Sequence, residues 1–572
     1  MSTVTPSSFP LFLVSLILPV VCFSGDAPAP RAPEPAAASA ADDWSTWGYD
    51  QERTGWNRGE TTLSKDNVKK LKLQWSAQLS TQPTDVALST VTAPLVVSGV
   101  RTSQGAKSLV FLLGTDDTMF ALDADSGHIV WQKTFINPIK PARPANWLCA
   151  NAANATPVID KKTGVIYFIT SDGKLRGLEL GDGAEYLTPT QMVAPFARAW
   201  SLNLIDQVVY TTSGRACGEI FDLNSAMPAA TVTARTPAPT SGPIPDASAA
   251  SAMDVRDPAH PQVTRFYTSN ARSAGPWGRG ALARGPNDTV ILETDDGLYD
   301  PAAGQFGDTI LLLAPKATKL VDSFTPKNHK YLMSKDLAGS ASPVVFPFGK
   351  KTLVAVGQKE GIVCLLDAAD LGGGPPDSHA TPFYQSPQLG NDEAQGTDPG
   401  QGVWGAITTY ETPDGRRFLY VPMYGPPSKN APPFKHNNGP IPNGSIMAFQ
   451  VTADGDKVSL DPQWTSSDMI LPDPPVVAND VLYAIQTGGQ ARQNTPMPDG
   501  SPRDPATTGA HYRATPVSNL VLYAFDAETG KPLYSSKKII ADWVHFSEPV
   551  VALGKVFLVT HDAHVYAFGL TK

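Results

Sequence analysis

The sequence has few cysteines, no excess of positive charge and no long apolar run. Only 4 of its 572 residues are cysteine, and none of them stands in a Cys-x-x-Cys-His motif, which argues against a disulfide scaffold and against covalently attached haem. The net charge is -9, and Lys and Arg form no run longer than a pair or so, which argues against a nucleic-acid partner. With 41% hydrophobic residues the chain is nevertheless apolar enough to bury a core.

The apolar run at residues 9–23 (FPLFLVSLILPVVCF) has the length of a signal peptide and is too short and too interrupted by proline for a membrane span. We therefore expect a signal peptide at residues 1–25, a Pro/Ala-rich linker at residues 26–42 and one folded domain at residues 43–572. No Lys or Arg precedes the run, and the residues before Cys22 fit a lipid-attachment motif poorly. The expected location is periplasmic or secreted, with no transmembrane span in the mature chain.

Three cysteines remain after such a cleavage. Cys149 and Cys217 lie in Gly/Ala/Asn-rich connections and are the candidates for one disulfide, whereas Cys364 lies in an apolar strand and is expected to be buried.

A hairpin pattern recurs along the chain. Residues 121–131 (ALDADSGHIVW) are echoed about 400 residues later by residues 524–534 (AFDAETGKPLY): in both, a strand enters an Asp-x-x-x-Gly turn and a second strand leaves it toward a large aromatic residue. A hairpin buries only one face, so repetition at a period of about 40 to 60 residues indicates units that stack on one another, as in solenoids and propellers. The 53 prolines and 47 glycines fit strands and turns better than long helices.

Eight such units can be counted, although seven would also fit the weaker starts. Clear starts stand at residues 93–97, 156–159, 342–345, 474–477 and 548–551, and weaker ones at residues 204–212, 288–294 with 309–313, and 403–410 with 418–423. The last unit ends at residues 565–569 without a fourth strand, and residues 71–79 form a strand without a hairpin before it. Joining the two ends closes a ring, which removes exposed sheet edges and favours an all-β, eight-bladed β-propeller closed by an N-terminal strand. Inserts at residues 236–262, 425–444 and 488–519 are expected on a blade face, where loops build a site.

The opening of the domain resembles a known family. Residues 43–50 (DWSTWGYD), Arg53, Gly55, Asn67-Val68 and residues 71–75, together with the Ala-x-Asp-x-x-x-Gly-x-x-x-Trp hairpin ending at Trp131, are similar to the quinoprotein dehydrogenases, in particular to their polyvinyl-alcohol-dehydrogenase-like branch. The resemblance covers most of residues 43–570. It implies an eight-bladed propeller that holds pyrroloquinoline quinone (PQQ) and Ca²⁺. The docking hairpins themselves are shared with propellers that bind no quinone, so the chemistry depends on the site.

The resemblance assigns three site residues. Asp336, seven residues before the proline that opens the next unit, matches the catalytic base that takes the hydroxyl proton of the alcohol, and it is also a candidate metal ligand. Lys359 matches the lysine that contacts the quinone, and Asp296 matches a calcium ligand. From the residues alone, a solvated or capping Asp336, an exposed turn Lys359 and a turn Asp296 stay open as alternatives.

Two departures from the family pattern stand against this reading. The chain has no adjacent cysteines, and neither the glutamate expected in the first unit, where residues 85–92 stand, nor a second-unit calcium carboxylate is found. The leading hypothesis is an exported alcohol-oxidising quinoprotein that uses PQQ and Ca²⁺ on a small-molecule or polymeric alcohol. Electrons would pass to a separate acceptor such as a cytochrome c. The alternative is a non-catalytic propeller that serves as a scaffold or binding module.

Overall fold

The computed structural model describes residues 1, 42–81, 89–141, 144–145, 149–152, 155–214, 248–269, 273–337, 339–372, 381–392, 401–489 and 516–571. The chain divides into two units, residues 1–39 and 40–572, and of the first unit only Met1 is described. Apart from Met1 and Asp42, the expected signal peptide and linker lie outside the described residues. Within the described ranges no helix is both long and apolar enough to cross a membrane.

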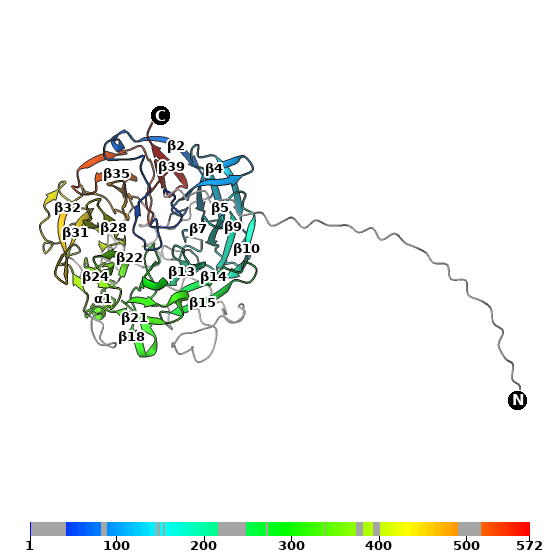
Figure 1. Cartoon of the computed structure of the whole chain (residues 1–572), viewed down its shortest axis with the longest axis horizontal. Coiled ribbons are helices and arrows are strands. Elements are labelled where there is room, and N and C mark those ends of the chain that lie inside the picture. Colours follow the sequence, from blue (N-terminus) through cyan, green and yellow to red (C-terminus); the bar gives the residue numbers. More distant parts are fainter. Residues whose placement is uncertain are drawn as a thin grey trace, which may run out of the picture. The chain divides into compact units, whose positions relative to one another are not determined.

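The second unit is a ring of antiparallel sheets, the blades, around a central axis (Figure 1). The predicted eight-bladed all-β propeller is confirmed, and the first strands that Figure 1 labels, β7, β22 and β28, lie near the axis. Blade 1 consists of β3 (Leu95–Thr102), β4 (Gly105–Leu113), β5 (Thr118–Asp123) and β6 (Ile129–Thr134), and blade 2 of β7 (Val158–Asp160), β8 (Val165–Ile169), β9 (Lys174–Glu179) and β10 (Glu185–Gln191). Blade 3 consists of β12 (Asn203–Ile205) with β11 (Arg198–Ala199), β13 (Val208–Gly214), β14 (Ala249–Asp254) and β15 (Gln262–Tyr267). Blade 4 consists of β16 (Leu282–Arg284), β17 (Val290–Glu293), β20 (Ile310–Leu313) and β21 (Leu320–Phe324).

Blades 5 to 8 continue the same order. Blade 5 consists of β22 (Gly339–Phe348), β23 (Lys351–Gln358), β24 (Val363–Asp367) and β25 (Tyr384–Gln385), with β27 (Gly405–Ala406) beside β22. Blade 6 consists of β28 (Thr408–Glu411) with β26 (Gly402–Val403), β29 (Arg417–Tyr424), β31 (Gly444–Asp454) and β32 (Lys457–Thr465) with β30 (His436–Asn437). Blade 7 consists of β33 (Val476–Ala478) with β1 (Trp56–Asn57), β34 (Val481–Gln486), β35 (Val521–Asp526) and β36 (Pro532–Ser535), and blade 8 of β37 (Val550–Ala552), β38 (Lys555–Val559), β39 (His564–Gly569) and β2 (Lys72–Gln78). Between blades 4 and 5 lies the helix α1 (His329–Lys335), and a small hairpin of β18 (Tyr299–Asp300) and β19 (Gln305–Phe306) extends from blade 4.

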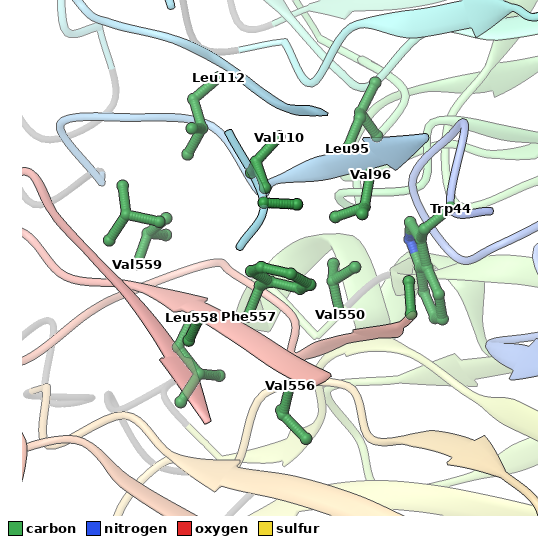
Figure 2. Packing of buried hydrophobic residues seen from close by; sticks show 14 of the residues in the cluster. Trp44, Leu95, Val96, Val110, Leu112, Val550, Val556, Phe557, Leu558 and Val559 are labelled. Atoms are coloured by element: carbon green, nitrogen blue, oxygen red, sulfur yellow. The ribbon is translucent and has the colours of Figure 1, made fainter. Parts of the chain in front are cut away.

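Position within a blade explains the strand sequences. An inner strand has a neighbouring blade on each face, so β5 (TMFALD) is buried along nearly all its length, whereas the outermost β6 (IVWQKT) has no fully buried residue. Blades pack through these apolar faces. Figure 2 shows Phe557 and Val559 of blade 8 facing Val110 and Leu112 of blade 1.

The two ends of the domain complete blade 8, as expected. The strand β2 pairs antiparallel with β39, with Ser76 opposite Tyr566 and Gln78 opposite His564. This pairing satisfies the backbone groups that an open edge would leave to solvent.

Tryptophans dock one blade on the next. The indole N–H groups of Trp75, Trp131 and Trp464 donate to the carbonyls of Ala124 (3.2 Å), Leu180 (2.9 Å) and Ala527 (3.1 Å) in the following blade. Each ring lies on the turn glycine: a Cβ at Gly127, Gly183 or Gly530 would come within 2.5, 2.9 or 2.4 Å of it. Tyr534 replaces Trp in blade 7 because its partner, blade 8, has no such turn: β39 and β2 come from opposite ends of the chain.

One predicted insert needs correction, and the structure shows the state of two of the three cysteines. The insert expected at residues 236–262 contains the strand β14, so it begins earlier, after Gly214. It joins the second and third strands of its blade, as do the inserts after Tyr424 and Gln486, and all three leave the face where the first strands begin. Cys149 is disulfide-bonded and Cys364 is a buried free thiol, while the expected partner Cys217 lies outside the described residues.

Candidate functional site

The three predicted site residues lie together on one face of the ring. Asp296 follows β17 of blade 4, Asp336 precedes β22 of blade 5, and Lys359 follows β23 of blade 5. Second strands end where first strands begin, so the fold brings these positions to the same face. The Lys359 Nζ lies 2.5 Å from Asp336 Oδ1 and 3.5 Å from Asp295 Oδ1. Carboxylate oxygens of Asp295, Asp296 and Asp336 all lie within 4.8 Å of one another.

Lys359 is a buried cation, so its interpretation as an exposed turn lysine is wrong. Its side chain is 2% exposed, and its ammonium group lies 5.4 Å from the centre of the Trp404 ring. The Asn391 Nδ2 donates to the Lys359 carbonyl at 2.6 Å, and a Cβ at Gly402 would come within 2.1 Å of the same oxygen. Burying an ammonium group is costly unless it is paired, and Lys359 has two carboxylate partners.

Asp336 has an unusual backbone conformation. It ends α1 with φ 53° and ψ 46°, the left-handed region, and its N–H donates to the Leu332 carbonyl. Glycine or asparagine is preferred at this position of a helix, so an aspartate with a C-terminal helix-capping role alone would be a poor choice. Its side chain is 38% exposed, which leaves one side of the carboxylate open.

The site holds more carboxyl groups than its lysine can neutralise. Burial first, and the charge of Asp295 second, raise the pKa of Asp296 to about 10 and the pKa of Asp308 to about 8. The same two causes raise the pKa of Glu293 well above its usual range, and Lys359 offsets only part of each rise. Such a group of carboxyls is suited to receive a cation, because a cation removes their mutual repulsion.

Glu293 shows how the fold makes room for this charge. It is 1% exposed, and neither of its carboxyl oxygens has a hydrogen-bond partner in the described part of the chain. The backbone N–H of Ala341 offsets part of the pKa rise without reaching hydrogen-bond geometry. A Cβ at Gly339 would lie 2.2 Å from the Glu293 carboxyl carbon, so a side chain at this position would displace the carboxyl group.

Aromatic rings and a buried guanidinium lie beside the carboxyl group cluster. Trp277 is joined to blade 4 next to Asp295, because its N–H donates to the Glu293 carbonyl at 3.1 Å. Its ring meets Trp200 edge-on at 5.0 Å, and the Arg198 guanidinium carbon lies 4.3 Å from its centre. The site therefore offers a carboxylate group, buried cations and aromatic faces together.

Sequence reasoning missed part of this arrangement. It named Asp296 but not Asp295, Glu293 or Asp308. It also missed Trp200, Trp277 and Trp404, each of which stands a few residues before the innermost strand of its blade. A tryptophan at this position is distinct from the docking tryptophans on outer strands, and that spacing could have identified the ring-facing set. Of residues 85–92, where a glutamate was expected, 85–88 lie outside the described residues.

The comparisons with known proteins agree with this architecture. A family model described as outer membrane protein assembly factor BamB matches residues 72–218. The quinohaemoprotein alcohol dehydrogenase of Comamonas testosteroni is 13% identical, with a TM-score of 0.57 over 94% of this chain and 82% of that chain. The chain therefore has the eight-bladed β-propeller fold and is similar in fold to this dehydrogenase.

Two further solved structures give the same result. A europium-containing methanol dehydrogenase is 12% identical, with a TM-score of 0.57 over 93% of this chain and 98% of that chain. The quinohaemoprotein alcohol dehydrogenase ADHIIG of Pseudomonas putida HK5 is 13% identical, with a TM-score of 0.55 over 93% and 80%. A search of the curated protein sequences found no match. Identities this low establish the fold and leave the activity to be argued from the site.

Proposed function

We propose that the protein is an exported oxidoreductase that oxidises an alcohol with PQQ and Ca²⁺ and passes the electrons to a separate acceptor. The observation that carries the proposal is the convergence of Asp336, Lys359 and the aspartates Asp295 and Asp296 on one face of the ring. A scaffold gains nothing from collecting buried like charges at this position, since each buried carboxyl lowers stability unless it is paired.

The carboxylate set fits a hard cation. Two oxygens bound to one Ca²⁺ at about 2.3–2.6 Å can be at most about 5 Å apart. The oxygens of Asp295, Asp296 and Asp336 meet this limit, since they lie within 4.8 Å of one another. Their neighbour Glu293 adds a further carboxyl group that has no hydrogen-bond partner among the described residues. These residues would hold the cation.

The neighbouring residues fit a flat, anionic cofactor. The Trp277 and Trp404 rings offer aromatic faces, and Lys359 and Arg198 offer positive charge close to those faces. When bound, PQQ would accept the hydride from the alcohol carbon, and Ca²⁺ would polarise the quinone carbonyl that receives it.

The chain's own residues would orient the alcohol and move its proton. Asp336 has the carboxylate that is partly open to solvent, so it is placed to accept the hydroxyl proton as the base. Lys359 fixes the orientation of Asp336 through their ion pair, and Asp295 holds Lys359 from its other side. A small-molecule or polymeric alcohol and an acceptor such as a cytochrome c are the proposed partners, and export rests on residues 1–25.

Reconstitution tests the proposal. Purified protein with PQQ and Ca²⁺ is expected to show bound-quinone absorbance and to reduce a dye with at least one of a panel of primary, secondary and polymeric alcohols. Absence of both signals in a folded protein would overturn the enzyme assignment.

A second candidate, a non-catalytic scaffold, is favoured by one observation: the family model matched at residues 72–218 is that of an outer membrane assembly factor. This candidate predicts that the carboxylates bind no cation. Terbium luminescence excited through tryptophan separates the two candidates without any turnover, since Tb³⁺ substitutes for Ca²⁺ in oxygen-rich sites.

A further inference from the structure

Residues 42–57 run once around the inside of the ring, where Figure 1 shows them in dark blue. They contact the innermost region of every blade, and eight of these contacts, one per blade, follow the order of the blades. The contacts, from blade 1 to blade 8, are Trp44 N to Val96 O (2.7 Å), Ile159 N to Ser45 O (2.8 Å), Thr46 Oγ1 to Leu202 O (3.1 Å), Arg284 N to Gln51 O (2.8 Å), Val345 N to Glu52 O (3.0 Å), Thr409 N to Thr54 O (2.9 Å), Val477 N to Gly55 O (2.8 Å) and Asn57 Nδ2 to Val551 O (2.7 Å).

The two ends of this segment meet. The Asn57 Nδ2 also donates to Asp42 Oδ1 at 3.0 Å, and the other oxygen of Asp42 accepts the Leu553 N–H at 2.8 Å. Residues 42–57 therefore form a closed loop whose ends are fixed to blade 8, the blade that also joins the two ends of the domain.

Trp47 fills the middle of the loop. It is 1% exposed and packs with Ala93 before blade 1 and with Ala406 between blades 5 and 6. A Cβ at Gly280, before blade 4, would come within 2.7 Å of its ring. Only a side chain on the axis can touch such widely separated blades at once.

Arg53 holds the loop together. Its Nη1 donates to the Trp47 carbonyl (2.6 Å) and to Thr46 Oγ1 (2.8 Å), its Nη2 to the Leu202 carbonyl (3.0 Å) and its Nε to the Leu282 carbonyl (3.0 Å). It is 1% exposed, so its removal would take one buried hydrogen bond from each of these acceptors.

We infer that residues 42–57 are an internal clasp that couples all eight blades into one cooperative unit. Blade packing alone links each blade only to its neighbours, so one blade could open while distant blades stay intact. A segment bonded to every innermost strand links distant blades directly. In blades 5 and 6 the clasp contacts, at Val345 and Thr409, lie further along the chain than Asp336 and Trp404. This inference does not depend on bound PQQ.

Hydrogen exchange of the full chain, read by mass spectrometry, tests the coupling. The perturbing variant is Arg53→Met. The matched control is Arg265→Met, because Arg265 is also buried and donates to carbonyls, those of Met192 and Gln191, outside the clasp.

The clasp predicts a long-range effect of Arg53→Met. Peptides containing Val345, Thr409 and Val477 should exchange at least ten-fold faster, although Arg53 bonds none of their blades. The control should accelerate exchange in blades 2 and 3 only. An effect of Arg53→Met confined to blades 3 and 4, whose carbonyls it holds, would overturn the inference.

A milder variant keeps the test decisive if Arg53→Met does not fold. Asn57→Ala removes the bonds to Val551 and Asp42 and leaves Arg53 intact. The clasp predicts faster exchange at Val345, on the opposite side of the ring, as well as in blade 8. Acceleration in blade 8 alone would contradict it.

Discussion

Asp336 gives the sharpest separation of function from stability. Its backbone is left-handed at φ 53°, where a non-glycine residue costs on the order of 1 kcal/mol. Asparagine tolerates this conformation, and in Asp336→Asn the buried Lys359 keeps Asp295 as its partner. Repulsion from Asp336 also raises the pKa of Asp296, so its removal relieves the carboxyl cluster. We expect the free energy of unfolding to change by no more than about 1 kcal/mol.

For a domain of this size, about 1 kcal/mol corresponds to about 1 °C in Tm, since the entropy of unfolding is about 2 cal/mol/K per residue. Turnover should fall by about 10²–10⁴, the usual contribution of a general base. Differential scanning fluorimetry and dye reduction by the reconstituted enzyme measure the two effects. Asp414→Asn, on an exposed hairpin, is the control and should change neither. Unchanged turnover in Asp336→Asn, or a fall in Tm above about 5 °C, would refute the reasoning.

Three further predictions concern the charges of the ring. Lys359→Met should lower the free energy of unfolding by about 3–5 kcal/mol, because it leaves buried carboxylates without their cation. The control Lys457→Met, at an exposed position, should not lower it. Equal denaturation midpoints for the two variants would contradict this prediction. Ca²⁺ at about 100 Kd should raise the free energy of unfolding by about 2.7 kcal/mol in the wild type but not in Asp296→Ala. Thermal melts with Ca²⁺ and with a chelator measure this effect. Equal Tm shifts in the two proteins would place the ion elsewhere. Burial raises the pKa of Glu548 to about 8 and the pKa of Asp473 to about 7. The folded state therefore binds these protons more tightly than the unfolded chain does. The free energy of unfolding should decline as the pH rises from about 4 toward 8. Glu548→Gln should flatten that decline in urea titrations at several pH values, and an unchanged slope would show that Glu548 does not titrate in this range.

The fold was predictable because its determinants are local and repeated. The turn glycine at Gly127 and the aromatic Trp131 identify a blade, and the unpaired strand at residues 71–79 identifies the closure. Even the exception at Tyr534 follows from topology, but that reason required knowing which blade comes next.

The site was only partly predictable because its members come together through tertiary structure. Asp336 and Lys359 were assigned from the resemblance, and the structure places them in an ion pair. Glu293 gave no signal, since a lone glutamate at the end of an apolar strand is ordinary until Gly339 of the next blade is seen against it. The circular path of residues 42–57 was equally hidden, because its hydrogen bonds involve backbone atoms that any sequence provides.

Equilibrium binding of PQQ tests the central claim most directly. Titration of the quinone into the folded protein, followed by quenching of tryptophan fluorescence and by calorimetry, is predicted to give one site per chain that requires Ca²⁺ and is lost in Lys359→Met. A protein that binds Ca²⁺ and melts normally, yet shows no quenching and no heat at millimolar PQQ, would contradict the account.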